Sequence, residues 1–259
     1  MPYCVDVADE VRLRAAIFDV DGVLVDAPHE RAWRETLDCL MAGLWAQLAG
    51  DIGYEAGSLT TERYQRAVAG RPRLDGARAG LEAVGVADPD DEHVQAFAEA
   101  KQTRLVELIE GELPPVFDDA VALLIGLQEM GLAVATASAS RNAGRLLAAI
   151  ALPDGRLLRD VLDADVSGLD GPGKPDPAIF IEAARRLGRR PKECLVVEDA
   201  PAGVEAARRG GMACVGVDRT GDADELRASG AQIVLDRLDR QEPSELLARL
   251  ERPGASSLA

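Results

Sequence analysis

The chain has 259 residues, of which 47% are hydrophobic, and its formal net charge is −16. Such an acidic balance argues against nucleic acid and anionic membranes as partners. The hydrophobic content argues against disorder, and the length suits one or two domains with a sizeable core.

The cysteines and the first residues bear on the cellular compartment. The cysteines show no paired spacing, which favours free thiols in a reducing compartment over disulfides or a zinc site. They are Cys4, Cys39, Cys194 and Cys214. The N-terminal stretch is too acidic for a secretory signal, and no apolar run approaches the ~18 residues that span a bilayer. We therefore expect a cytoplasmic protein.

Apolar runs alternate with helical patterns along much of the chain. Unbroken apolar runs are typical of strands covered on both faces. They predict strands at 13–18, 132–137, 194–197, 212–217 and 232–235. Between them, helical spacing predicts a helix capped by Asp118 and Asp119, one beginning at Pro177 after an N-cap at Asp176, and one at 202–209. This alternation indicates right-handed crossovers and a parallel sheet.

The stretch from about 29 to 113 has helical periodicity throughout and no strong strand pattern. Pro28 and the Pro114-Pro115 pair bracket it. We expect a core domain of 1–28 and 114–259 with an inserted helical domain of 29–113. Hinged on two short linkers, such an insertion would lie over the site as a lid. We expect the tail, 252–259, to be disordered.

Polar residues follow the predicted strands where each one ends. Two acids and a glycine come after the first strand, serines after the second, a lysine before a helix, and an acidic pair after a later strand. In open parallel sheets, ligands bind beyond the carboxyl ends of the strands. The side chains expected to converge are Asp19, Asp21, Ser138, Lys174, Glu198 and Asp199.

Each of these motifs also has a simpler structural interpretation. Asp19, Asp21 and Gly22 could form a calcium loop, although the glycine falls too early for an EF-hand and a strand precedes it. Ser138 could cap a helix that starts near Ser140. Lys174 could be an ordinary surface lysine.

Taken together and in this order, the four motifs resemble those of the haloacid dehalogenase-like superfamily. The resemblance covers nearly the whole chain. It implies an enzyme with a Rossmann-like α/β core, built on a parallel sheet, and an inserted α-helical cap domain.

The resemblance also implies catalytic roles. Asp19 would attack phosphorus and carry an aspartyl phosphate, and Asp21 would serve as the general acid and base. Lys174 would neutralise the phosphoryl group, and the Ser138 hydroxyl would bind its oxygens.

A cation is required because a carboxylate repels a phosphate. Mg²⁺ prefers oxygen ligands in octahedral geometry. The resemblance assigns it Asp19, the backbone carbonyl of Asp21, and Asp199, with Glu198 supporting it directly or through water.

Within the superfamily, the local pattern resembles β-phosphoglucomutase and its close phosphatase relatives. The run 136–142 is similar to that group's second motif, and the run 70–73 falls where its cap carries a glycine and an arginine that grips the sugar's other phosphate. The implied substrate-binding residues are Gly70, Arg71, Arg73, Ala139, Ser140, Arg141 and Asn142. Arg71 and Arg73 could instead belong to a solvated basic loop.

One segment departs from the pattern of that group. The hinge after Asp26 is about two residues shorter than usual, and Ala27 replaces a polar residue. Because the hinge sets how the cap closes, this departure puts in doubt whether the closed cap excludes water from the site as a mutase requires.

We therefore expect Mg²⁺-dependent phosphoryl transfer on a small sugar phosphate by a monomer, as in β-phosphoglucomutase. A sugar-phosphate phosphatase is the alternative. A non-enzymatic phospho-acceptor domain is more remote, since its nucleophile would lie on a later strand and no helical cap would intervene.

Overall fold

The computed structural model describes residues 12–69, 71–152, 154–168 and 171–252. Cys4, Gly70 and the tail after 252 lie outside the described residues. The chain divides into a core unit, Met1–Val25 with Val116–Ala259, and a helical unit, Asp26–Pro115. The domain boundaries expected after 28 and after 113 lie three residues later and two residues earlier than those of the units.

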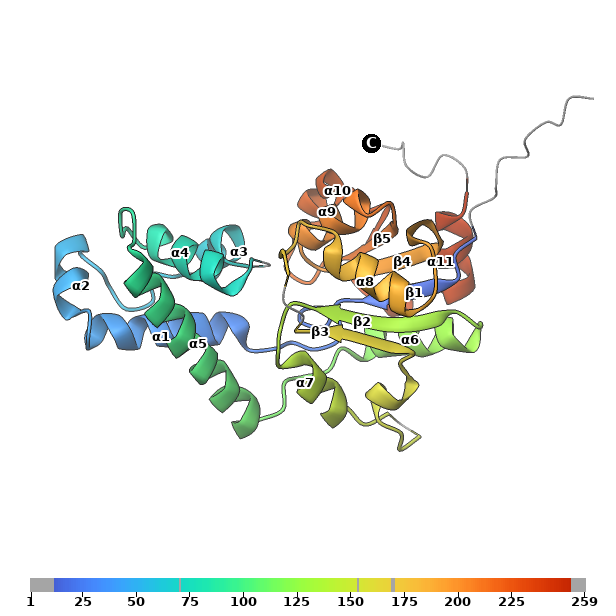
Figure 1. The fold of residues 1–259 in the computed structure, drawn as a ribbon, viewed down its shortest axis with the longest axis horizontal. Helices are drawn as coiled ribbons and strands as arrows, with labels where there is room; N and C mark the ends of the chain where they lie inside the picture. Colours follow the sequence, from blue (N-terminus) through green and yellow to red (C-terminus); the bar gives the residue numbers. More distant parts are fainter. Residues whose placement is uncertain (1–11, 70, 153, 169–170, 253–259) are drawn as a thin grey trace, which may run out of the picture. The chain divides into compact units, whose positions relative to one another are not determined.

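The core unit contains a six-stranded, fully parallel sheet in the order β3-β2-β1-β4-β5-β6 (Figure 1). Its strands are β1 (Ala15–Phe18), β2 (Ala133–Ser138), β3 (Ala164–Ser167), β4 (Cys194–Glu198), β5 (Ala213–Val217) and β6 (Ile233–Leu235). The predicted α/β fold with a parallel sheet is confirmed. The chain builds outward from β1 to β3 and then returns to place β4 beside β1. The carboxyl ends of β1 and β4 therefore form the switch point at which such sheets bind ligands.

The register brings the ends of the central strands to one level. Phe18 of β1 lies opposite Thr136 of β2 and Val197 of β4. The Asp19 amide continues the ladder by donating to the Val197 carbonyl at 3.0 Å. Residues that leave these strands at their carboxyl ends are thus held close together by backbone pairing.

Helices cover both faces of the sheet. They are α6 (Asp118–Glu129), α7 (Ala143–Ala149), α8 (Ala178–Arg186), α9 (Pro201–Arg209), α10 (Ala223–Ser229) and α11 (Pro243–Leu250), with short 3₁₀ turns η1 (Leu158–Val161), η2 (Pro191–Glu193) and η3 (Leu238–Arg240). Helices α8, α9 and α10 pack on one face, while α6 contacts β1 and β2 and carries α11.

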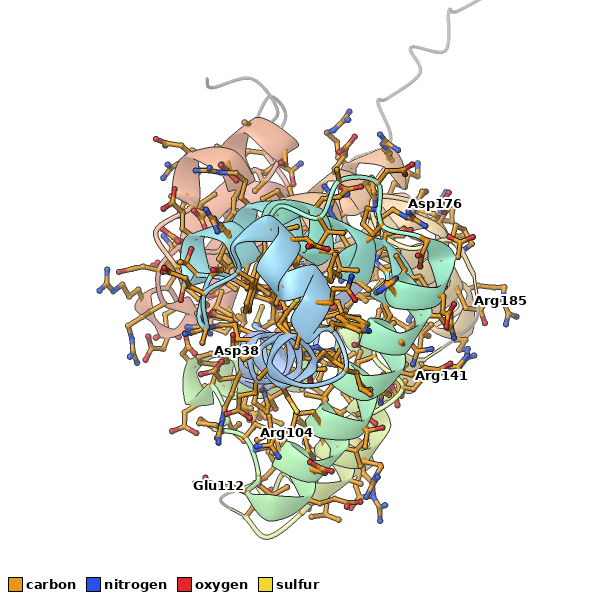
Figure 2. All side chains as sticks on the ribbon, turned by 90° about the vertical axis from the view of Figure 1, so that its left-hand side faces the viewer. Asp38, Arg104, Glu112, Arg141, Asp176 and Arg185 are labelled. Carbon is orange, nitrogen blue, oxygen red and sulfur yellow. The ribbon has the colours of Figure 1, made fainter. Side chains whose placement is uncertain are left out.

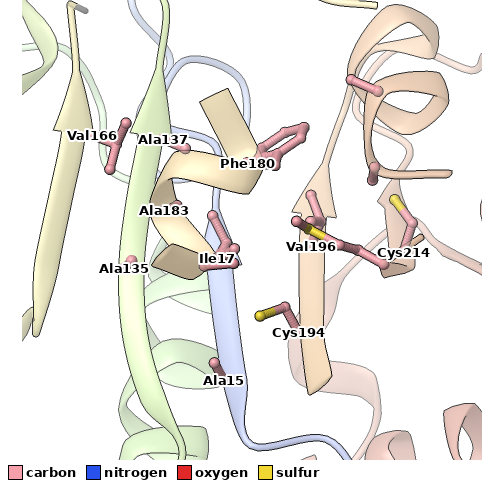
Figure 3. Packing of buried hydrophobic residues seen from close by; sticks show 14 of the residues in the cluster. Ala15, Ile17, Ala135, Ala137, Val166, Phe180, Ala183, Cys194, Val196 and Cys214 are labelled. Atoms are coloured by element: carbon pink, nitrogen blue, oxygen red, sulfur yellow. The ribbon is translucent and has the colours of Figure 1, made fainter. Parts of the chain in front are cut away.

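A tightly packed core joins the sheet to α8, α9 and α10 (Figure 3). Phe180 of α8 is fully buried in this core, near Ile17 and Val196. Burying a side chain of this size stabilises the fold by roughly 1.5–3 kcal/mol. Cys194 and Cys214 lie in the same core as free thiols, as expected, and burial raises the pKa of Cys194 to about 12.

The strand β3 was not predicted, because its sequence is half polar. It lies at one edge of the sheet, and Asp165 within it is exposed. Edge strands contact one neighbour only, so they lack the unbroken apolar run of the central strands. Helix α8 begins at Ala178, one residue later than expected, and the Asp176 carboxylate accepts a hydrogen bond from the Ala178 amide at 2.9 Å.

The prediction that Asp118 and Asp119 cap α6 is wrong. Phe117 occupies the cap position, and no side chain caps the helix there. Asp119 is buried and accepts two hydrogen bonds of 2.9 Å from the Arg219 guanidinium, with a third of 2.8 Å from the Leu238 amide. Burial works to raise the pKa of Asp119, but these hydrogen bonds outweigh it and hold the pKa below its ordinary value.

We expect Asp119→Asn to destabilise the core unit by about 3 kcal/mol at pH 7, because it leaves the Arg219 charge poorly paired. A carboxyl group whose pKa is lower in the folded than in the unfolded protein stabilises the fold. This stabilisation is fully present above the pKa of the unfolded protein, near 4, and is lost as the pH falls through the pKa of the folded protein. The gap between wild type and variant in denaturant unfolding should therefore shrink below pH 4. Asp118→Asn, at the exposed neighbouring position, is the control. Equal stability of Asp119→Asn and wild type at pH 7 would contradict this account.

The helical unit consists of α1 (His29–Ala42), α2 (Ala46–Ile52), α3 (Thr61–Ala67), α4 (Arg73–Ala83) and α5 (Asp91–Gly111). Trp33 and Phe97 meet edge to face in its core, with ring centroids 4.8 Å apart. Arg104, labelled on α5 in Figure 2, donates to Glu35 of α1 at 2.7 Å. No helix among the described residues is long and apolar enough to cross a membrane.

Candidate functional site

Three charged side chains meet beyond the carboxyl ends of β1 and β4. The Lys174 ammonium donates to Asp19 Oδ1 at 2.6 Å and to Glu198 Oε1 at 2.7 Å. Asp19 follows β1 directly, Glu198 ends β4, and the loop before α8 brings in Lys174. All three side chains are at most 8% exposed. Burial works to lower the pKa of Lys174, but the two carboxylates outweigh it and raise the pKa, so the lysine stays charged.

Asp199 and Gly22 complete this part of the site. An added Cβ at Gly22 would lie 2.0 Å from Asp199 Oδ2, and Gly22 has φ +91°. Only glycine combines this left-handed backbone with room for the neighbouring carboxylate. The amide of Asp199 donates to Glu198 Oε2 at 2.8 Å, which fixes the two consecutive acids relative to each other.

Asp19, Glu198 and Asp199 are suited to holding a cation. Their nearest carboxylate oxygens lie within 4.8 Å of one another. Burial raises the pKa of Asp19 to about 8, against the opposing effect of Lys174, and repulsion from Glu198 and Asp21 adds to it. Burial and the neighbouring acids also raise the pKa of Asp199. The raised pKa values show that the three acids cannot all be ionised comfortably beside the single charge of Lys174, so a bound cation would favour their charged forms, and the all-oxygen donor set fits Mg²⁺.

Ser138, the last residue of β2, lies at the same site. Its hydroxyl donates to Asp21 Oδ2 at 3.4 Å and accepts from the Ser140 amide at 3.0 Å. The Ser140 hydroxyl in turn accepts from the Asn142 amide at 3.2 Å. Helix α7 begins at Ala143, so Ser138 does not cap it. The loop after β2 thus connects Asp21 to the residues predicted to bind substrate.

Other predicted substrate-binding residues are spread over both units. Ala139 and Arg141 belong to the loop after β2, and both are exposed. Arg71 lies in the turn before α4, Arg73 begins α4, and both are exposed on the helical unit. Gly70 lies outside the described residues.

The predicted hinge forms a linker of three residues in the structure. Helix α1 begins at His29, leaving 26–28 as the first linker, and the Asp26 amide donates to the Pro115 carbonyl of the second linker at 2.8 Å. A groove of about 570 Å³ lies in the helical unit beside these linkers, lined among others by Ala27 and Pro28. Lys101 is buried in the same unit, and its Nζ lies 2.9 Å from His29 Nδ1.

Two residues that contact the site were missed from the sequence. The Phe180 ring lies beneath the Lys174 ammonium, 5.1 Å from its centroid, a geometry that favours a cation. Gly203 of α9 lies against Glu198. A glycine inside a helical pattern often has a packing reason, and this was the available signal for Gly203. Phe180 gave none, because its spacing only marked the buried face of a helix.

A sequence model of haloacid dehalogenase-like hydrolases matches residues 13–211, which covers most of the chain and every site residue of the core unit. The chain belongs to this family. The phosphoglucomutases and phosphatases that resemble the chain are enzymes of the haloacid dehalogenase type, and so is this protein.

Two proteins that resemble the chain over most of its length have different named activities. A β-phosphoglucomutase of Mycobacterium bovis is 34% identical, covering 86% of this chain and 89% of its own. A fructose-1-phosphate phosphatase of Escherichia coli is also 34% identical, covering 80% of this chain and 97% of its own. Among solved structures, an archaeal β-phosphoglucomutase from Pyrococcus has a TM-score of 0.69 at 28% identity, covering 90% of this chain and 97% of its own. The chain is thus similar to both a mutase and a phosphatase.

Proposed function

We propose that the protein transfers a phosphoryl group of a small sugar phosphate through an aspartyl phosphate on Asp19, in the manner of β-phosphoglucomutase. The observation that carries this proposal is the buried Asp19 carboxylate at the sheet's switch point, 2.6 Å from the Lys174 ammonium. A carboxylate so placed can attack phosphorus while a fixed cation offsets the charge of the phosphoryl oxygens.

The transfer would take place in two half-reactions, in which Asp19 and Asp21 have different roles. A carboxylate oxygen of Asp19 forms a bond to phosphorus as the bond from phosphorus to the leaving oxygen breaks, and Asp21 gives that oxygen its proton. In the second half-reaction Asp21 takes the proton of the acceptor hydroxyl, which attacks phosphorus and releases Asp19. The Ser138 hydroxyl, now 3.4 Å from Asp21, would turn to bind a phosphoryl oxygen.

Mg²⁺ would be held by Asp19, the backbone carbonyl of Asp21, and Asp199. When bound, it supplies positive charge that lets a carboxylate and a phosphate approach each other. Glu198 already accepts from Lys174 through one oxygen and from the Asp199 amide through the other. These contacts favour a supporting role for Glu198, by holding Lys174 in place or through water, over direct ligation.

The acceptor distinguishes a mutase from a phosphatase, and both activities occur among the relatives. The polar loop from Ser138 to Asn142, with Arg71 and Arg73 of the helical unit, favours a gripped phosphosugar as acceptor. The short linker at Ala27 and Pro28 favours the alternative, a sugar-phosphate phosphatase, if altered closure admits water. We propose the mutase, with residues 29–113 acting as the cap.

The proposal extends to the protein's partners, its cellular compartment and its oligomeric state. Its strongly acidic composition suits small-molecule chemistry without nucleic acid, and free buried thiols suit the cytoplasm. We expect a monomer, which light scattering of the purified protein measures directly.

Turnover of a small phosphoryl donor tests whether the protein is an enzyme of this kind. Incubation with p-nitrophenyl phosphate and Mg²⁺ should release many equivalents of nitrophenol per protein. A stable product with one phosphoryl group per chain and no turnover would instead support a phospho-acceptor domain.

We expect Arg73→Ala to raise KM for a phosphosugar at least ten-fold and to leave KM for p-nitrophenyl phosphate nearly unchanged. The reason is that an arginine fork binds the non-transferred phosphate, which the aryl phosphate lacks. Arg66→Ala, an exposed arginine of α3 paired with Glu62, is the control. An equal effect of Arg73→Ala on both substrates would mean that Arg73 belongs to a solvated loop and does not bind the second phosphate. Arg71→Ala would then be tested in the same way.

A further inference from the structure

Gly203, in the first turn of α9, determines where the Glu198 side chain can lie. An added Cβ at Gly203 would lie 1.4 Å from Glu198 Oε1, 2.1 Å from Cδ and 2.5 Å from Cγ. Because Cγ is too close as well, turning the carboxylate about its last bond would not relieve the overlap. Glu198 thus occupies space that any other amino acid at position 203 would fill.

The backbone gives no other reason for a glycine at this position. Gly203 is not among the glycines with positive φ, and its amide makes an ordinary helical turn by donating to the Ala200 carbonyl at 3.0 Å. Alanine forms helices better than glycine, so helix propensity alone would favour alanine here. What Gly203 contributes is the absence of a side chain.

The space matters because of the contacts that Glu198 makes from it. Glu198 is 1% exposed and bonds to both the Lys174 ammonium and the Asp199 amide. The same ammonium donates to Asp19 Oδ1. A direct chain of contacts therefore runs from Gly203 through Glu198 and Lys174 to the carboxylate that would attack phosphorus.

We propose that Gly203 is a positioning residue for phosphoryl transfer. By leaving its side-chain space empty it seats Glu198, and Glu198 holds Lys174 against Asp19 and orients Asp199 at the end of β4. The kinetic consequence rests on the proposed function, whereas the seating of Glu198 rests on the geometry alone.

A double-mutant cycle tests this inference. The variants are Gly203→Ala, Glu198→Ala and the two combined, with Gly50→Ala of α2 as control, because a Cβ there meets nothing within 4 Å. The measurements are the melting temperature without metal, Mg²⁺ affinity by calorimetry, kcat and KM for p-nitrophenyl phosphate, and a crystal structure of Gly203→Ala.

We expect Gly203→Ala to lower the melting temperature, to weaken Mg²⁺ binding about 10- to 100-fold, and to lower kcat more than it raises KM. The crystal structure should show Glu198 displaced and its contact with Lys174 lost. In the Glu198→Ala background the same methyl group should cause no further loss of stability, Mg²⁺ affinity or kcat, because the space is then vacant. If Gly203→Ala alone fails to fold, the double variant should still fold like Glu198→Ala.

Equal losses from Gly203→Ala in both backgrounds would overturn the inference, as would an undisplaced Glu198 in the crystal structure or a double variant that also fails to fold. Absence of turnover in the wild-type protein would count against the proposed function instead. The melting temperatures and the crystal structure would then still decide whether Gly203 seats Glu198.

Discussion

Asp19→Asn is expected to abolish turnover on every phosphate substrate while leaving the fold intact. An amide cannot form the acyl phosphate through which both half-reactions pass. The fold should tolerate the change because asparagine has the same shape as aspartate. Asparagine is also neutral, and a neutral group suits this position because burial, with repulsion from Glu198 and Asp21, raises the pKa of Asp19 to about 8. Turnover should be followed by phosphate release and by product formation, and the fold by circular dichroism and the melting temperature.

Asp21→Asn provides the matched comparison, because it keeps the nucleophile and removes the proton carrier. It should lower kcat by roughly 10²–10⁴-fold, the usual contribution of one general acid–base group. Trapping with a labelled phosphoryl donor should label Asp21→Asn on Asp19 and leave Asp19→Asn unlabelled. Near-normal turnover by Asp19→Asn would mean that another group attacks phosphorus.

Removal of divalent metal is expected to have an equally large effect. Asp19, Glu198 and Asp199 present carboxylate oxygens within 4.8 Å of one another, and a phosphorylated substrate adds further negative charge. Metal-stripped protein should show no turnover, and Mg²⁺ should restore it. Because the raised pKa of Asp19 makes protons compete for the same oxygens, Mg²⁺ affinity should rise as the pH increases from 6 to 8.

The two consecutive acids should respond differently to substitution. Asp199→Ala should weaken Mg²⁺ binding more than Glu198→Ala, since Glu198 already bonds to Lys174 and to a backbone amide. Titration calorimetry on stripped protein measures both affinities. Equal turnover by stripped and Mg²⁺-loaded protein would exclude the metal from the reaction.

Periodicity in the sequence was enough to predict the central sheet. The runs at 13–18, 132–137 and 194–197 fall on β1, β2 and β4, because strands buried on both faces are apolar at every position. The rule that ligands bind beyond the carboxyl ends of parallel strands also predicted that residues far apart in sequence would lie close together at the site. Lys174 and Asp19 are 155 positions apart in sequence and 2.6 Å apart in the structure.

Features that depend on a distant partner were missed. Asp119 looked like a helix cap because its neighbours fit one, but Arg219, 100 positions later, takes its carboxylate. The role of Gly203 depends on the path of the Glu198 side chain, which no local pattern reveals. The edge strand β3 was missed because one of its faces is polar. The catalytic and binding roles of the individual site residues stay predictions.

The most direct test of the central claim is the fate of the phosphoryl group on a sugar substrate. The protein is incubated with Mg²⁺, β-glucose 1-phosphate and a trace of glucose 1,6-bisphosphate, and glucose 6-phosphate and inorganic phosphate are followed together. We predict glucose 6-phosphate with little free phosphate, and no reaction by Asp19→Asn under the same conditions. Rapid phosphate release without glucose 6-phosphate, on this or another sugar phosphate, would contradict the mutase and make the protein a phosphatase.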